Sequence, residues 1–167
     1  MRIAETAYPL PDGRVLTIRS AAPKDAASLA LHRCITSGET PFMARYPEEC
    51  TRDAETLAGW LQGMAEDAQN FAVTAFDGGN VVGDLGIQRV RAHLKMQHRA
   101  NLGVSIQAAY CGCGLGRAML QIAVAQAREN GFEQIELGVF ADNVRAIHLY
   151  RSLGFEDFRR NARGVQP

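Results

Sequence analysis

The sequence predicts a mixed α/β (α+β) fold, organised as a single domain over residues 1–167. Three observations support this prediction. Short β-branched runs alternate along the chain with amphipathic segments of helical period. A glycine-rich turn joins two of the predicted strands into a hairpin. The later half of the chain then repeats a strand-then-helix order, which is typical of a β-α-β-α unit.

The chain begins with a predicted strand and a predicted helix. "VLTI" at residues 15–18 is a short β-branched run that follows the turn residues "PDG". Residues 22–35 have the composition of a helix. Pro23 fits its first turn, and Asp25 lies favourably beside the positive helix start.

A second helix is predicted over residues 51–67, with Thr51 as its N-cap. Its apolar side chains fall at helical spacing on one stripe: Leu57, Trp60, Leu61 and Met64. Residues 37–50 contain turn residues and two prolines, so they predict a loop between the two helices.

Three strands are predicted next. Residues 70–76 and 81–90 are apolar runs joined by "DGGN", whose residues tolerate the positive φ angles of a tight hairpin turn. Residues 91–100 are polar and basic and predict a linker. "NLGVSI" at 101–106 is short and apolar enough for a buried strand.

The last predicted elements are a helix, a strand and a helix. The helix over residues 115–130 has one apolar stripe and is closed by Asn130-Gly131. "FEQIELGVF" at 132–140 predicts a strand, and residues 142–155 predict a helix ended by Gly154.

Composition excludes several classes of protein. Eighteen basic residues balance eighteen acidic ones, so the charge favours neither nucleic acid nor an anionic membrane. No apolar run approaches the roughly 20 residues of a membrane span, and the start does not resemble a signal peptide. The cysteines lack the spacing of a disulfide framework, which predicts reduced thiols and a cytoplasmic location. They are Cys34, Cys50, Cys111 and Cys113.

The stretch "AYCGCGLGRAML" at residues 109–120 packs three glycines and two cysteines before a helix. No metal is expected there, because Cys-x-Cys offers two ligands and no His cluster has zinc-like spacing. Glycines at a helix start let the backbone approach an anion, and Arg117 adds a positive charge, which favours a phosphate site. A tight turn in which the glycines only relieve crowding explains the pattern equally well.

Two motifs, in order along the chain, resemble the GNAT superfamily of acyl-CoA-dependent N-acyltransferases. "LGVSI" and then "QAAYCGCGLGRAML" resemble the family's coenzyme A motif, a strand followed by Gln/Arg-x-x-Gly-x-Gly/Ala at a helix start. "IELGVFADNVRAIHLYRSLGFE" is similar to the second motif. Its matching residues are Asn143, Ala146, Tyr150, Gly154 and Phe155.

The resemblance implies the GNAT fold: a central mixed, mostly antiparallel sheet flanked by about four helices. A splayed pair of strands in that sheet is expected to hold coenzyme A. The resemblance also implies acetyl-CoA as cosubstrate and no metal. Tyr150 is expected to protonate the departing thiolate, although a core aromatic on an amphipathic helix would show the same spacing.

The resemblance assigns coenzyme A binding to two backbone segments and one side chain. Main-chain groups of the strand are expected to hold the pantetheine arm, the glycine loop to cradle the pyrophosphate, and the Asn side chain to bond the arm. These residues are Val104, Ser105, Ile106, Cys111, Gly112, Cys113, Gly114, Leu115, Gly116, Arg117 and Asn143.

The glycine loop departs from the family pattern. Cys111 stands where the family usually has Gln or Arg, and Cys113 where a basic residue is frequent. The anion site is therefore expected to rely on backbone dipoles and Arg117. A side chain at Gly114 is expected to block the approach of the ligand to the loop amides.

The general base is not assigned by the resemblance. Relatives that acetylate protein N-termini often carry Glu in "L-E-V", and Gly138 stands at that position here. The acceptor ammonium must lose a proton before its nitrogen can attack. Glu39, Asp84 and Glu136 are the candidate acids, and a chain of waters is an alternative.

The expected activity is transfer of an acetyl group from acetyl-CoA to an amine by direct attack, without a covalent intermediate. The acceptor is expected to be a small-molecule or peptide amine. A module that binds or senses acyl-CoA without turnover is the alternative, because the Glu is missing at Gly138. Phe42, Tyr46 and Trp60 either line an acceptor pocket or pack in the core.

The end of the chain is short for the family, which usually adds a strand after "L-G-F". Phe158 is placed to begin such a strand, but few residues follow it. Either the edge of the sheet is short or another subunit covers it, as in a homodimer.

Overall fold

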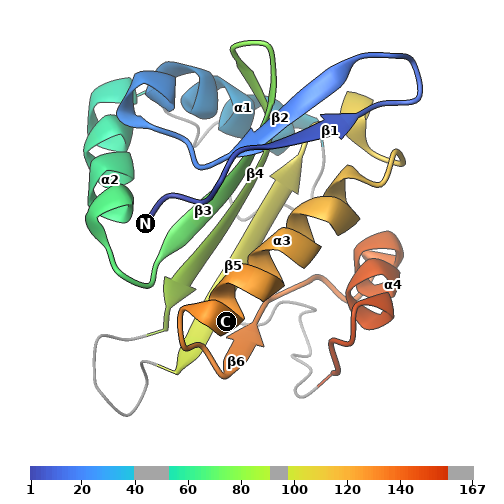
Figure 1. Ribbon diagram of the computed structural model, residues 1–167. Coiled ribbons are helices and arrows are strands. Elements are labelled where there is room, and N and C mark those ends of the chain that lie inside the picture. Colours follow the sequence, from blue (N-terminus) through green and yellow to red (C-terminus); the bar gives the residue numbers. More distant parts are fainter. Residues whose placement is uncertain (40–52, 91–97, 158–167) are drawn as a thin grey trace.

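The computed structural model describes residues 1–39, 53–90 and 98–157 (Figure 1). Its strands are β1 (Thr6–Pro9), β2 (Val15–Arg19), β3 (Phe71–Asp77), β4 (Asn80–Arg89), β5 (Arg99–Ile106) and β6 (Gln134–Glu136). Its helices are α1 (Ala26–Glu39), α2 (Ala54–Glu66), α3 (Leu115–Glu129) and α4 (Val144–Ser152), with 3₁₀ turns η1 (Pro23–Asp25) and η4 (Ala108–Tyr110).

The strands form one sheet in sequence order, β1-β2-β3-β4-β5-β6. All neighbouring pairs are antiparallel except β5 and β6, which are parallel. The sheet is therefore mixed and mostly antiparallel, as the sequence predicts.

The parallel pair is short. The ladder pairs Arg99, Ala100 and Asn101 of β5 with Gln134 to Glu136 of β6. β5 continues to Ile106, whereas the chain after β6 turns away toward α4 (Figure 1). The two strands therefore separate beyond Asn101, which creates a split in the sheet beside the end of β5.

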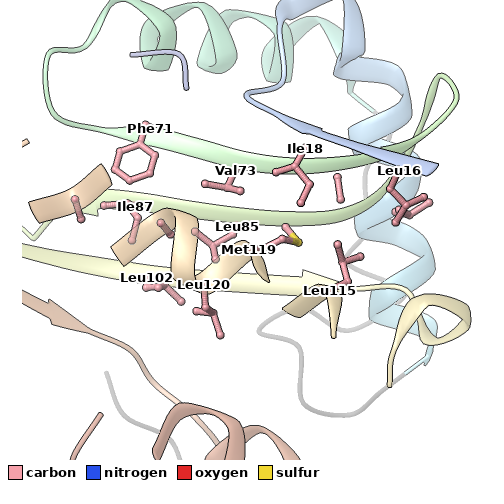
Figure 2. Close-up of a cluster of buried hydrophobic side chains, with 14 of the residues drawn as sticks. Leu16, Ile18, Phe71, Val73, Leu85, Ile87, Leu102, Leu115, Met119 and Leu120 are labelled. Atoms are coloured by element: carbon pink, nitrogen blue, oxygen red, sulfur yellow. The ribbon is translucent and has the colours of Figure 1, made fainter. Parts of the chain in front are cut away.

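Helices cover both faces of the sheet. Met119, Leu115 and Leu120 of α3 pack with β-strand side chains in one buried cluster, drawn in Figure 2. Leu29 of α1 and Leu61 of α2 belong to a second cluster on the opposite face. Both clusters are apolar and almost fully excluded from water, so burial of this surface stabilises the stacking of helices on the sheet.

Most predicted elements are confirmed with small shifts in their ends. The hairpin turn is the clearest case: β3 ends at Asp77, β4 begins at Asn80, and Gly78 between them has φ +61°. Gly131 and Gly154 have positive φ after α3 and α4, as expected for residues that end helices.

Three predictions at the amino-terminal side are wrong. β1 was not expected, because Thr6–Pro9 is mostly exposed, shows no apolar alternation and ends in a proline. α1 continues to Glu39 instead of ending near residue 35, and Thr36 within this extension donates to the carbonyl of His32. The N-cap of α2 is Asp53, not Thr51, and its carboxylate accepts from the amide of Thr56.

Two further differences concern β6 and the cysteines. β6 spans three residues instead of 132–140, because only this part of the segment pairs with β5. Cys34 is disulfide-bonded, so the prediction of reduced thiols is wrong at that residue, whereas Cys111 and Cys113 are free. Phe42, Tyr46 and the strand expected from Phe158 lie outside the described residues.

Candidate active site

The glycine loop forms a turn that leads directly into α3. Gly112 and Gly114 have φ of +78° and +83°, a region that side-chain-bearing residues rarely adopt. Gly114 is the N-cap of α3 and no side chain caps this helix end. The first amides of the helix therefore remain available to an anion at the positive end of the helix dipole.

A basic side chain that the sequence did not reveal lies at this loop. The guanidinium of Arg145, from α4, is 3.2 Å from the position that a Cβ on Gly112 would occupy. Arg117, the predicted cation, donates instead to the hydroxyl of Ser152 at 2.9 Å. Two cations thus lie near the loop, one from each helix that flanks it.

The edge of β5 presents main-chain groups to the split. The amide of Gln107 donates to the carbonyl of Val82, and the amide of Val90 to the carbonyl of Arg99. Because hydrogen-bonded residues alternate along an antiparallel pair, the backbone of Ser105 bonds β4. The backbone groups of Val104 and Ile106 consequently point the other way, toward the split.

α4 closes the site beside the loop. A Cβ on Gly116 would lie 3.1 Å from Ile106 of β5 and 3.5 Å from Leu149 of α4, so α3, α4 and β5 meet here. Asn143 is the N-cap of α4, and its side-chain oxygen accepts from the amide of Ala146. The predicted cofactor ligand thus also fixes the start of this helix.

Tyr150 lies one residue beyond Leu149 on α4. Its ring meets that of Phe155 edge-on, with centroids 6.0 Å apart. Burial raises the pKa of the Tyr150 hydroxyl, which keeps it protonated at neutral pH. A protonated, half-buried phenol beside the split has the form that a general acid requires.

The opposite face of the sheet carries Asp84 on β4. Its carboxylate accepts from the hydroxyl of Thr74 at 3.1 Å and lies 3.7 Å from the guanidinium of Arg33. The side chain is 12% exposed. Burial raises the pKa of the Asp84 carboxyl, against the lowering effects of Arg33 and Thr74.

Asp84 and Ser105 are directly paired across β4 and β5, so their side chains lie on the same face of the sheet. The hydroxyl of Ser105 lies 2.9 Å from Nε2 of His32 on α1. The Gln107 side-chain amide lies 3.2 Å from Nδ1 of the same ring and also donates to the carbonyl of Val81. This arrangement makes Nδ1 the acceptor and Nε2–H the donor to Ser105.

Desolvation lowers the pKa of His32 to about 4, and the neighbouring Arg33 lowers it further. The imidazole is therefore neutral near pH 7. Arg33 also lies over the ring of Trp60, 5.3 Å from its centroid, so Trp60 faces this polar cluster instead of packing only in the core.

The other two candidate bases lie elsewhere. Both oxygens of Glu39 accept from the amide of Ala108, so this carboxylate holds the turn after β5. Glu136 forms an ion pair with Arg99 and is paired with Asn101 in the ladder. Ser105 is four residues further along β5, or roughly 13 Å by the rise of a strand.

A cavity of about 760 Å³ lies on the open side of β6. Tyr150 and Glu136 line it together with apolar side chains of α4 and of residues 132–141. None of the residues of the glycine loop or of Val104–Ile106 contributes to its lining. The cavity thus adjoins the predicted site through Tyr150 and does not coincide with it.

Within residues 1–39, 53–90 and 98–157, no group of three or more His, Cys, Asp or Glu side chains is arranged to hold a metal ion. Over the same residues, no helix has the length and apolar character needed to cross a membrane.

Comparison with known sequences identifies relatives over most of the chain. The profile of the acetyltransferase (GNAT) family matches residues 31–155. The L-amino acid N-acyltransferase MnaT of Escherichia coli K12 is 26% identical over 140 residues, which cover 84% of this chain and 79% of MnaT. A mycothiol acetyltransferase of Frankia casuarinae is 29% identical over 168 residues. That match covers 92% of this chain but only 46% of the Frankia protein.

Solved structures show the same architecture. A GNAT-family acetyltransferase from Streptococcus pneumoniae superposes with a TM-score of 0.85 and 29% identity, covering 90% of each chain. YncA of Salmonella typhimurium, solved with its cofactor acetyl-CoA, superposes with a TM-score of 0.76 and 23% identity. That match covers 90% of this chain and 86% of YncA. Family profile, relatives and fold agree, and they establish that the chain is an acyltransferase belonging to the GNAT family.

Proposed function

We propose that the protein transfers an acetyl group from acetyl-CoA to a primary amine by direct attack within a ternary complex. The observation that carries the proposal is the position of Asp84 and Tyr150 relative to the split in the sheet. Asp84 is paired with Ser105 beside the split, and Tyr150 lies on the helix that meets Ile106 there. A base and an acid thus approach the same strand end from different elements.

Acetyl-CoA fits the residues present. Main-chain groups of Val104 and Ile106 face the split and would hold the pantetheine arm. The amides from Gly112 to Arg117, with Cys111 and Cys113 contributing backbone only, would cradle the pyrophosphate, and Arg145 adds charge. The thioester supplies an activated acetyl group. Because acetyl-CoA is an intracellular metabolite, a cytoplasmic location is part of the proposal.

Asp84 is the general base in this proposal. Its raised pKa makes the carboxylate a stronger proton acceptor than an exposed aspartate, as removal of a proton from an ammonium requires. Glu39 is occupied by the amide of Ala108, and Glu136 by Arg99 at the far end of β5. Of the three candidate acids, only Asp84 combines burial with a position opposite Ser105.

Tyr150 is the general acid. The departing thiolate of coenzyme A must be protonated, and a phenol whose pKa is raised by burial still carries its proton at neutral pH. The neutral amine attacks, the carbon–sulfur bond breaks, and Tyr150 donates its proton to sulfur. Asp84 takes up the proton that the ammonium loses before attack.

The acceptor in this proposal is the amine of an amino acid or a peptide. MnaT acts on L-amino acids by its name. A structural neighbour from Brucella melitensis with 26% identity and a TM-score of 0.74 is a ribosomal-protein-alanine N-acetyltransferase. Both names describe amines next to a carboxyl or peptide carbonyl. Arg33, beside Asp84, is placed to attract such an oxygen.

The test is turnover by Asp84→Asn, measured as thiol released from acetyl-CoA with a panel of amino acids, peptides, polyamines and aminoglycosides. Loss of the base should lower turnover by about 10²–10⁴-fold with coenzyme A affinity unchanged. Glu136→Gln is the matched control and should turn over normally. Undiminished turnover by Asp84→Asn would refute the assignment of the base. Tight coenzyme A binding with no turnover on any amine would support the sensing module, which the acyltransferase relatives do not favour.

A further inference from the structure

The glycine loop is in contact with a strand far from it in sequence. Tyr8 of β1 donates its hydroxyl hydrogen to the carbonyl of Cys113 at 2.7 Å, across 105 residues of chain. Tyr8 also packs against the main buried cluster, and β1 is held to β2 over four paired residues. The hydroxyl is thus delivered to the loop by the sheet itself.

This hydrogen bond fixes the orientation of a peptide plane. In a trans peptide the carbonyl of one residue and the amide of the next point in opposite directions. The carbonyl of Cys113 points at Tyr8, so the amide of Gly114 points away from Tyr8. Gly114 is the N-cap of α3, where an outward amide adds to those of the first helical turn.

The same contact explains the residue at position 114. A Cβ on Gly114 would lie 2.8 Å from the Tyr8 hydroxyl, closer than carbon and oxygen atoms approach. Its φ of +83° independently disfavours a side chain. The Cβ would point toward Tyr8, so the expectation that a side chain here blocks the ligand directly is replaced by displacement of Tyr8.

We propose that Tyr8 is a positioning residue for coenzyme A: its hydroxyl holds the peptide between Cys113 and Gly114 so that the Gly114 amide faces the pyrophosphate. This inference rests on the proposed function of the loop. It assigns part of the cofactor site to β1, which lies outside both sequence motifs. Tyr8 itself contacts the loop backbone and acts on the ligand through Gly114.

A neighbouring tyrosine provides the matched control. The hydroxyl of Tyr110 donates to the Asp77 carboxylate at 2.6 Å, and Arg14 joins the same carboxylate. Tyr110→Phe thus removes a hydroxyl beside the loop whose partner is a side chain of the β3–β4 hairpin. Tyr8→Phe removes one whose partner is the loop backbone.

The experiment compares full-length wild type, Tyr8→Phe and Tyr110→Phe. Coenzyme A affinity is measured by calorimetry, and hydrogen exchange of the Gly114 amide by nuclear magnetic resonance without ligand. We expect Tyr8→Phe to weaken coenzyme A binding by about threefold to tenfold, the effect of one lost hydrogen bond. The Gly114 amide should exchange faster in Tyr8→Phe only, while amides of α2 keep their wild-type rates.

An affinity for coenzyme A within twofold of wild type in Tyr8→Phe would overturn the proposal. Equal losses of affinity in both variants would also overturn it, because the effect would then not depend on the Cys113 carbonyl. If wild type itself does not bind coenzyme A, the proposed function fails. Unchanged exchange of the Gly114 amide in Tyr8→Phe would still refute the positioning role separately.

Discussion

The two halves of the candidate site are built in different ways. The glycine loop binds through main-chain amides, and its side chains at Cys111 and Cys113 are not required to carry charge. The cluster around Asp84 is made of side chains from α1, β3, β4 and β5, each held by another: Thr74, Arg33, His32 and Ser105.

This difference separates geometry from chemistry. A loop that binds by its backbone depends on a few φ angles and on what orients its peptides, so substitutions that keep the glycines are tolerated. A buried side-chain cluster depends on every partner, because a polar group left unpaired there costs free energy. We therefore expect mutations to affect affinity in the loop, and turnover and pH dependence in the cluster.

Tyr150→Phe tests whether the acid belongs with the cluster in its effects, although α4 borders the loop. Turnover should fall by about 10²–10⁴-fold, since general acid catalysis is lost while the ring contact with Phe155 remains. Steady-state thiol release and calorimetric coenzyme A affinity give the two readouts. If turnover is retained, Tyr150 serves packing alone.

His32→Gln tests the cluster by its effect on stability. The pKa of His32 is about 4 in the folded protein and near 6.5 when unfolded, so the unfolded chain binds more protons between these values. The free energy of unfolding should therefore fall by about 3 kcal/mol as the pH drops from 7 to below 4. That contribution should be absent from the variant.

The difference between wild type and His32→Gln, measured by urea unfolding at several pH values, isolates this effect. Asp84, whose pKa is raised, acts in the opposite direction over part of the same range in both proteins. Gln retains a donor for Ser105, so the fold should survive. Parallel pH profiles for the two proteins would contradict the burial of a neutral imidazole.

Gly114→Val tests the dependence of the loop on geometry. Strain at φ +83° and displacement of Tyr8 should lower coenzyme A affinity by about 100-fold. Gly131→Val is the control, because Gly131 has φ +88° but nothing within 4 Å of its missing Cβ. If both variants bind coenzyme A equally well, the conformation at Gly114 does not shape the anion site.

Arg145→Ala should have the smallest effect on the loop. We expect a loss of about fivefold in coenzyme A affinity, or about 1 kcal/mol, because the backbone supplies most of the binding. The remaining affinity should depend less on salt than in wild type. Calorimetry at two salt concentrations measures both, and an unchanged salt dependence would exclude a direct role for Arg145.

The fold was predictable where its signals are local. Asp77 to Asn80 define a hairpin turn, and the glycines before Leu115 mark a strand-to-helix turn, because each needs only neighbouring residues. β1 could not be predicted, since its four residues carry no apolar alternation and are stabilised only by pairing with β2.

The site divides in the same way. Spacing alone pointed to the glycine loop and to Tyr150. Arg145 was missed although its sequence position was visible, because its approach to Gly112 depends on how α4 packs. His32 meets Ser105 across 73 residues, and no local pattern marks such a contact. Choosing Asp84 over Glu136 likewise required the register of β4, β5 and β6.

The separation of β5 from β6 leaves a sheet edge inside the molecule. Backbone groups of Val104 and Ile106 there are arranged as if to receive another strand. A ligand with amides in an extended chain satisfies such an edge in the way a peptide does, by β-augmentation. Pantetheine carries two amides of this kind, so peptides in extended conformation are the natural competitors for this part of the site.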